Sequence, residues 1–295
     1  MTKSCRPGHH KGDTGTLVAP VGSVAIAFRT RTLEGSAVSE LLGTRQTVIL
    51  AAGNGSRLSA ARGNLPKPLV RVAGRALIEH ALDQAAAAGV EEAIIVTGNA
   101  ADQMRAHLET VESPLKLTVV HNARYHEPNG VSLLAAAPFV SGPFFLQMAD
   151  HVFAQPVLHF LDRADAAPAD AVRLLVDYHP VNLDEDDATK VCTSGRLISA
   201  IGKDVYPYDA VDTGCFRLDP RIFTALDEVA RHEPPSVTLG MRRMLAQGLF
   251  AAVPLSGVRW TDVDTPEDYA KAELLLRKSA VPARARREAA TAARS

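Results

Sequence analysis

The chain has 295 residues, 46% of them hydrophobic and 22% charged, and a formal net charge of -1 at pH 7. This composition is that of an ordinary globular protein with a substantial core, and it argues against both a basic nucleic-acid-binding surface and a charge-rich disordered chain. The most apolar long stretch, residues 133–149, is interrupted by Pro138, Gly142 and Pro143, so no membrane span is expected. The chain does not open on a compact apolar segment with a cleavage site, and its three cysteines have no metal-binding or redox spacing. We therefore expect a cytoplasmic protein that does not bind nucleic acid.

The two ends of the chain differ from its middle. Residues 1–44 are rich in Gly, Thr and Ser without sustained periodicity, and we expect an appended or disordered segment there. Residues 277–295 carry several Lys and Arg residues among Ala and Ser, which predicts a basic flexible tail. The folded domain is expected over residues 45–276.

The first predicted element is a buried strand over residues 47–52, which ends in the loop Gly53-Asn54-Gly55-Ser56-Arg57. Glycines let a backbone approach a phosphate closely and expose its N–H donors. Arg57 in this loop and Lys67 in a following Pro-Lys-Pro segment supply cations for a highly charged ligand such as a triphosphate. The order of loop, Arg and Pro-Lys is much more specific than a pair of glycines alone.

Strands and helices then alternate along the chain. Helical spacing of apolar residues predicts a helix over residues 75–88, with Gly89 where it should stop. The following expected elements are strands over 93–97, 116–121 and 144–148, and helices over 102–109 and 130–137. Strands that are apolar throughout and separated by helices indicate a doubly wound, Rossmann-like and mostly parallel sheet of the α/β class.

The pattern changes after about residue 155, where short extended segments are separated by polar turns. We expect strands over 171–177, 189–192, 197–201, 214–218, 250–253 and 258–260, and helices over 220–230, 237–246 and 266–276. These strands are expected to extend the same sheet. The first half, about residues 45–155, would then bind a nucleotide, and the second, about residues 156–276, an acceptor.

Carboxylates follow two of the predicted strands. Asp150 comes directly after the apolar run 144–149, and ligands of open parallel sheets bind beyond the carboxyl ends of the strands. A carboxylate there must be solvated, paired or bound to a metal, and Mg²⁺ suits one or two carboxylates together with phosphate oxygens. Asp262 or Asp264 would complete the site, while Asp264 or Thr265 could instead cap the helix that Pro266 begins. A plain turn residue is the alternative reading of Asp150.

These features together resemble the sugar-phosphate and alcohol-phosphate nucleotidyltransferase superfamily over residues 46–276. Within it, the motifs look most like those of CTP:inositol-1-phosphate cytidylyltransferases. The resembling segments are Asn129-Gly130-Val131-Ser132-Leu133-Leu134, Met148-Ala149-Asp150-His151-Val152, Ala188-Thr189-Lys190-Val191, Ile201-Gly202-Lys203 and Val211-Asp212-Thr213-Gly214. The resemblance implies a GT-A-like α/β/α sandwich. In many relatives this domain is fused to a membrane-embedded synthase that uses the CDP-alcohol, so we expect any such partner of this chain to be a separate protein.

The resemblance also implies roles for individual residues. Arg57 and Lys67 would neutralise the triphosphate, Asp150 would bind Mg²⁺ with Asp262 or Asp264, and Lys190 would hold the acceptor phosphate. The implied acceptor-hydroxyl ligands are Asp212 or Thr213, and the implied nucleotide ligands are Ala51, Ala52, Gly53, Asn54 and Gly55, with Gly98, Asn122, Asn129 and Ser132 as lesser candidates for the base pocket. Each of the last four is about as well explained as a turn or capping residue.

The expected reaction joins CTP and a phosphorylated polyol, such as inositol 1-phosphate, to give a CDP-alcohol and pyrophosphate. A phosphate monoester is largely dianionic near neutral pH, since its second pKa is about 6, so no general base is required. The open alternatives are another substrate pair (phosphocholine, a phosphonate or a sugar 1-phosphate with CTP, UTP or GTP) and a non-catalytic nucleotide-binding module.

Overall fold

The apolar run near residue 48 forms β2 (Gln46–Ala51), an inner strand of the ten-stranded sheet. The structure is a computed structural model that describes residues 25–27, 44–53, 65–163, 172–181, 184–246, 248 and 250–279. Strands β5 (Glu92–Thr97) and β7 (Phe144–Met148) flank β2, and both run parallel to it. Parallel pairing continues to β6 (Lys116–His121), whose outer edge carries the antiparallel β1 (Ala25–Ala27). The α/β class predicted from the sequence is confirmed in this half.

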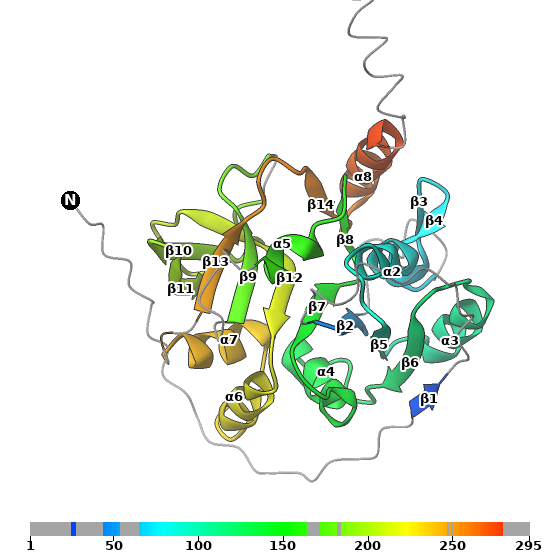
Figure 1. Cartoon of the computed structure of the whole chain (residues 1–295), viewed down its shortest axis with the longest axis horizontal. Helices are drawn as coiled ribbons and strands as arrows, with labels where there is room; N and C mark the ends of the chain where they lie inside the picture. The colour runs from blue at the N-terminus through cyan, green and yellow to red at the C-terminus, as the bar shows by residue number, and fades with distance from the viewer. Residues whose placement is uncertain are drawn as a thin grey trace, which may run out of the picture.

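Helices cover both faces of the sheet, as the burial of every residue of β2 requires. Ile49 packs in a core on one face, whereas Val48 and Leu50 pack in a second core on the other. Figure 1 shows the two helical layers on either side of the strands. The first face carries α2 (Leu77–Ala87), α3 (Ala101–Thr110) and α5 (Leu158–Asp162), and the second carries α4 (Asn129–Ala136), α6 (Arg221–Ala230) and α7 (Val237–Leu245).

The second half of the chain extends the sheet through β12 (Ala210–Leu218). One end of β12 pairs antiparallel with β7, in register from Leu218↔Phe144 to Cys215↔Gln147. Its first residues pair antiparallel with β10 (Lys190–Ser194), and β9 (Val172–Asp177) pairs antiparallel with both ends of β12. The sheet continues through β11 (Leu197–Gly202) and β13 (Phe250–Pro254) and returns to β12 through β9. Pairing in this half is mainly antiparallel, so parallel pairing is less extensive than the sequence predicts.

Smaller elements complete the described chain. They are the 3₁₀ turns η2 (Lys67–Leu69) and η3 (Ala137–Phe139), the hairpin strands β3 (Arg71–Val72) and β4 (Arg75–Ala76), the paired strands β8 (His151–Phe153) and β14 (Trp260–Asp262), and α8 (Pro266–Ser279). A third apolar cluster packs α8 against β3, α2 and β8. Among the described residues, none of the helices has both the length and the apolar character needed to cross a membrane.

The predicted elements occur in the predicted order, with shifts at their ends. The largest shift is at β12, which begins four residues before the predicted 214, and β14 occupies 260–262 instead of 258–260. β14 pairs only with the three-residue β8, so its position depends on one tertiary contact that a periodicity cannot reveal. Residues 277–279, predicted as the start of a tail, continue α8. Of the predicted N-terminal segment, residues 1–24 and 28–43 lie outside the described part of the chain, as do residues 280–295.

Candidate active site

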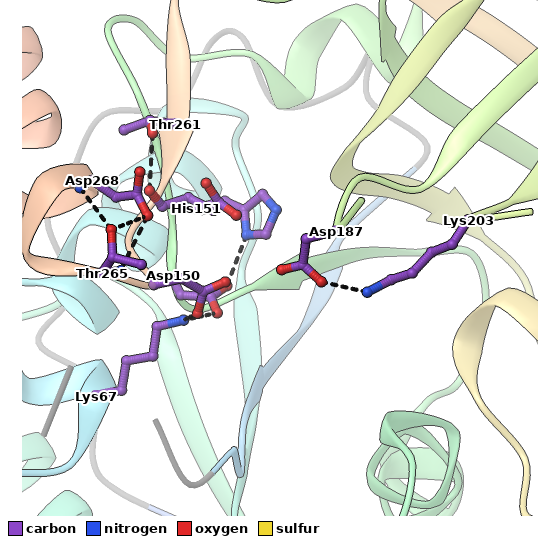
Figure 2. Close-up of polar contacts among 10 residues, drawn as sticks. Lys67, Asp150, His151, Asp187, Lys203, Thr261, Thr265 and Asp268 are labelled. Carbon is purple, nitrogen blue, oxygen red and sulfur yellow. Dashed lines mark hydrogen bonds and ion pairs between the residues drawn. The ribbon is translucent and has the colours of Figure 1, made fainter. Parts of the chain in front are cut away.

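Lys67 lies at the centre of the candidate site. Its backbone is held in η2 between Pro66 and Pro68, and its side chain is only 8% exposed. The ammonium Nζ donates to Asp150 Oδ2 at 2.6 Å and also to Asp264 Oδ1. Asp150 follows β7 and Asp264 follows β14, so one buried cation joins three segments that are far apart in sequence (Figure 2).

The three charges stabilise one another. Burial alone would lower the pKa of Lys67, but the two carboxylates outweigh it and hold that pKa above its ordinary value. Burial would likewise raise the pKa of Asp150, yet the Lys67 ammonium and the His151 ring hold it well below the usual range. Two carboxylates against one ammonium give these three groups a formal charge of -1.

His151 holds the second oxygen of Asp150. Its Nδ1 lies 2.8 Å from Asp150 Oδ1, and the neighbouring carboxylates raise the pKa of the ring although burial opposes this. The ring stacks on Trp260 with a centroid distance of 5.6 Å and an interplanar angle of 10°. The ring also lies close to Gly214, where a Cβ would come within 2.9 Å of His151 Cδ2. The indole Nε1–H of Trp260 in turn donates to Asp177 Oδ2 at 2.9 Å.

The structure separates the acids near the start of α8. Thr265 and Asp268 cap the helix reciprocally, since Asp268 N donates to Thr265 Oγ1 and Asp268 Oδ2 accepts from Thr265 N. Asp264 is thereby left to face Lys67. Burial and the nearby carboxylates raise the pKa of Asp262, which lies on β14 beside His151.

The residues expected at the acceptor lie along β10 and β12. Burial raises the pKa of Asp212 to about 6, although Gly214 N donates to its Oδ1 at 2.7 Å. Lys190 is 5% exposed, and its Nζ donates to the carbonyl of Lys203 at 2.9 Å and lies 5.6 Å from the centroid of the Tyr206 ring. Thr213 is fully buried and donates to the carbonyl of Leu175, so its hydroxyl is engaged within the sheet.

The expected nucleotide ligands follow β2, β5 and β6. Gly53 is exposed directly after β2, beyond the buried Ala51 and Ala52, whereas Asn54, Gly55 and Arg57 lie outside the described residues. A Cβ at Gly98, after β5, would come within 2.8 Å of the carbonyl of Ala52, which accounts for a glycine there. The strands therefore bring Gly53 and Gly98 to one edge of the sheet.

The remaining candidates for the base pocket are engaged within the protein. Asn122 Nδ2 donates to Ser132 Oγ at 2.9 Å, and both residues are buried. The side-chain oxygen of Asn129 accepts from Val237 N at 2.9 Å and so joins α4 to the start of α7. These contacts give each side chain a structural role, and their part in base binding stays a prediction.

The donor set fits Mg²⁺ better than a softer metal. No group of three or more His, Cys, Asp and Glu side chains in the described ranges is arranged to hold a metal ion. Mg²⁺ commonly takes only one or two carboxylates and completes its shell with water and phosphate oxygens. Asp150 and Asp264, which share one cation through Lys67, are therefore suitable ligands once a nucleotide supplies phosphates.

Two pairs of residues near the site could not be identified from the sequence. Trp260 and His151 stack only because β14 pairs with β8, and Asp187 meets Lys203 across a turn at 2.5 Å. The one signal for the second pair is the acidic run of residues 184–187 next to the Lys190 motif, which is usually read as a solvated turn.

Residues 47–203 match the sequence model of the family described as MobA-like NTP transferase domain. The chain is 34% identical over 236 residues to the bifunctional IPC transferase and DIPP synthase of Aquifex aeolicus. This alignment covers 79% of this chain and 52% of that protein. It is 27% identical over 247 residues to the UTP–glucose-1-phosphate uridylyltransferase AglF of Haloferax volcanii, covering 81% of this chain and 99% of that relative. Among solved structures, the inositol-1-phosphate CTP transferase from T. maritima matches with a TM-score of 0.72 and 25% identity, over 81% of this chain and 97% of that one. The chain spans about half the length of the bifunctional relatives.

Proposed function

The chain belongs to the family of MobA-like NTP transferase domains and is a nucleotidyltransferase, and from this premise we propose that it joins CTP to inositol 1-phosphate. The products would be a CDP-alcohol and pyrophosphate, and Mg²⁺ would be the cofactor. The relatives named for IPC transfer and for inositol-1-phosphate CTP transfer support this choice of substrates. The uridylyltransferase relative keeps a sugar 1-phosphate with UTP as the alternative.

The observation that carries the proposal is the pairing of the buried Lys67 ammonium with Asp150 and Asp264. The obstacle to the reaction is that one phosphate must approach another, so cations must offset the repulsion. Mg²⁺ held by the two carboxylates would stabilise the charge that develops on the α-phosphate and on the departing pyrophosphate. Lys67 would then be released towards the triphosphate, where its charge is needed.

The proposed reaction is a direct in-line displacement. An oxygen of the acceptor phosphate forms a bond to the α-phosphorus of CTP, and the bond from that phosphorus to the bridging oxygen of pyrophosphate breaks. The acceptor oxygen is already deprotonated at neutral pH, so the chain needs to position it and need not accept a proton. His151 accordingly orients Asp150 and takes no part as a base.

The acceptor would lie over the ends of β10 and β12. Lys190 is nearly buried there and would bind the acceptor phosphate, while Asp212 has a carboxyl group suited to hydrogen bonding with hydroxyls of a polyol. Gly53 and Gly98 would face the nucleotide on the other side. In this arrangement residues 45–155 bind CTP and residues 156–276 bind the acceptor. A CDP-alcohol-using synthase is the proposed partner activity, and the cytoplasm is the proposed location.

The test is pyrophosphate release in the presence of Mg²⁺, with each of the four ribonucleoside triphosphates offered inositol 1-phosphate, phosphocholine, a phosphonate and glucose 1-phosphate. The proposal expects release with CTP and inositol 1-phosphate. Release with another pair would retain the chemistry and overturn the substrates. CTP binding without release from any pair would instead favour a nucleotide-binding module.

A further inference from the structure

We infer that Trp260 and Asp177 are positioning residues of the proposed metal site, which act through His151 to fix the carboxylate of Asp150. This inference rests on the proposed function, because it concerns a side chain that would hold Mg²⁺ there. The contacts form one chain. Asp177 Oδ2 accepts from the indole Nε1–H at 2.9 Å, the indole stacks on the His151 ring, and His151 Nδ1 lies 2.8 Å from Asp150 Oδ1.

The register of two short strands places the indole over the His151 ring. Trp260 lies opposite Phe153 in the antiparallel pairing of β14 with β8, and His151 is two residues before Phe153 on the same face. A diagonal neighbour in an antiparallel pair is within reach of an aromatic side chain. The indole centroid lies 5.6 Å from that of His151 and 6.1 Å from that of Phe153, with interplanar angles of 10° and 20°. The imidazole therefore packs against a flat surface that spans the strand pair.

A hydrogen bond determines the orientation of that surface. An indole held by packing alone can slide in its own plane, whereas a fixed acceptor for its single N–H gives it one position. Asp177 supplies this acceptor from the end of β9, and its Oδ1 accepts from His179 N at 2.9 Å, which fixes the carboxylate itself. Asp177 also lies opposite Val211 on β12. The indole is thus anchored to the acceptor half of the sheet.

The carboxylate at the other end of the chain of contacts needs this support. Asp150 Oδ2 accepts from Lys67 Nζ at 2.6 Å, and Oδ1 faces His151, so each oxygen is held by one side chain (Figure 2). Mg²⁺ demands nearly ideal octahedral geometry, and a group that orients a metal ligand contributes roughly 10–100-fold to metal affinity. Lys67 is proposed to turn to the triphosphate. His151 then continues to orient Asp150, and the stack that fixes His151 determines how precisely it does so.

A second aromatic stack separates this role from simple packing. Phe144 and Phe223 stack with a centroid distance of 5.7 Å and an interplanar angle of 5°, and neither ring has a polar atom to be held. Phe144 begins β7, and Asp150 follows the other end of the same strand. Loss of this stack would loosen the packing of β7 without touching the contacts of Asp150.

The experiment measures by calorimetry the affinity for CTP with Mn²⁺ and without a divalent ion, in the absence of an acceptor so that no turnover occurs. The ratio of the two affinities reports what the metal contributes. Trp260→Leu should lower this ratio by about tenfold, the lower end of the range for a group that supports a metal ligand, with the metal-free affinity unchanged. Trp260→Phe keeps a flat ring without the N–H and should lower the ratio by only about threefold, within the range for one hydrogen bond.

Asp177→Ala should also lower the ratio by about threefold, because it removes the acceptor of the same hydrogen bond. It should cause no further loss in the Trp260→Leu background, because its route to the metal is the indole. The chain has a single tryptophan, so its indole N–H gives one identifiable NMR resonance. That resonance should move upfield in Asp177→Ala, without any substrate present, and an unmoved resonance would overturn the role given to Asp177.

Phe223→Leu is the matched control, which should lower the melting temperature and leave the ratio unchanged. An unchanged ratio in Trp260→Leu would overturn the inference. Equal weakening of CTP binding with and without Mn²⁺ would also overturn it, because that result indicates a general disruption of the fold. UTP is titrated in parallel. Preference for UTP, or binding without pyrophosphate release, would count against the proposed function alone, since the ratio for the nucleotide that binds still tests the inference.

Discussion

The substitution Gly214→Ala tests how the site is held together. Gly214 has a φ of +75°, and a Cβ there would lie 2.9 Å from His151 Cδ2 and 3.0 Å from Met148 Cγ. An alanine in the left-handed region costs about 1–2 kcal/mol, and overpacking of a well-packed site costs about 1–3 kcal/mol more. The sum, about 2–5 kcal/mol, corresponds to a fall in melting temperature of roughly 10 °C for a chain of this size.

Gly195→Ala separates the two contributions. Gly195 has a φ of +63°, but nothing lies within 4 Å of the position that its Cβ would take. This control therefore keeps the backbone strain and removes the collision, and it should lower the melting temperature by roughly 5 °C.

Thermal unfolding followed by circular dichroism gives both melting temperatures, and the emission of Trp260 gives a second readout. Trp260 is the single tryptophan of the chain, and His151 stacks on it. A displaced ring should change that emission in Gly214→Ala and not in Gly195→Ala. If the two variants have the same melting temperature and the wild-type emission, a Cβ at position 214 does not collide with His151. The predicted loss of stability from overpacking is then wrong.

Three further predictions concern the charges of the site. Lys67→Met should lower the rate of pyrophosphate release by about 10²-fold or more, because a transition-state cation is lost; a near-normal rate, with Lys116→Met as the control, would contradict the role given to Lys67. Asp212→Asn should be more stable than the wild type at pH 8, because a folded-state pKa of about 6 makes the charge of Asp212 destabilising. That advantage should appear as the pH rises from about 4 to about 6, and pH-dependent melting curves without it would refute the burial argument. Addition of Mg²⁺ with CTP should change the emission of Trp260 through Asp150 and His151, and this change should be absent in Asp150→Ala.

The sequence predicts the parallel half of the sheet well, because its strands are apolar on both faces. Val48 and Ile49 pack into cores on opposite sides, so neither side of β2 needs a polar residue and the run cannot be mistaken for an exposed strand. The antiparallel half is less predictable. Gly214 interrupts β12 at a register shift between Asp212 and Phe216. From the sequence alone, this glycine is predicted to be the first residue of a strand and not a position within one.

The candidate site also has a part that the sequence predicts and a part that it does not. Asp150 directly follows β7, the parallel neighbour of β2, so its place at the carboxyl end of the sheet follows from the strand order. Lys67 lies well beyond the end of β2, and its contact with Asp150 is a property of the fold. Whether Asp262 or Asp264 faces Lys67 depends on where β14 ends, and that residue is set by pairing with β8. The Asp187–Lys203 pair joins two loops of the second half, and the acidic run of residues 184–187 does not by itself specify which cation it contacts.

β12 has a consequence for how the two substrates meet. It is hydrogen-bonded to β7, which ends beside Asp150, and to β10, which begins at Lys190. The distance between the proposed donor and acceptor subsites is therefore set by the length of one continuous strand. Within the described residues the two halves share this strand, so they cannot separate there without breaking its hydrogen bonds to β7 or to β10. Deleting or inserting one residue in β12 would shift the two proposed subsites relative to each other. It would also turn every later side chain of the strand to the opposite face of the sheet.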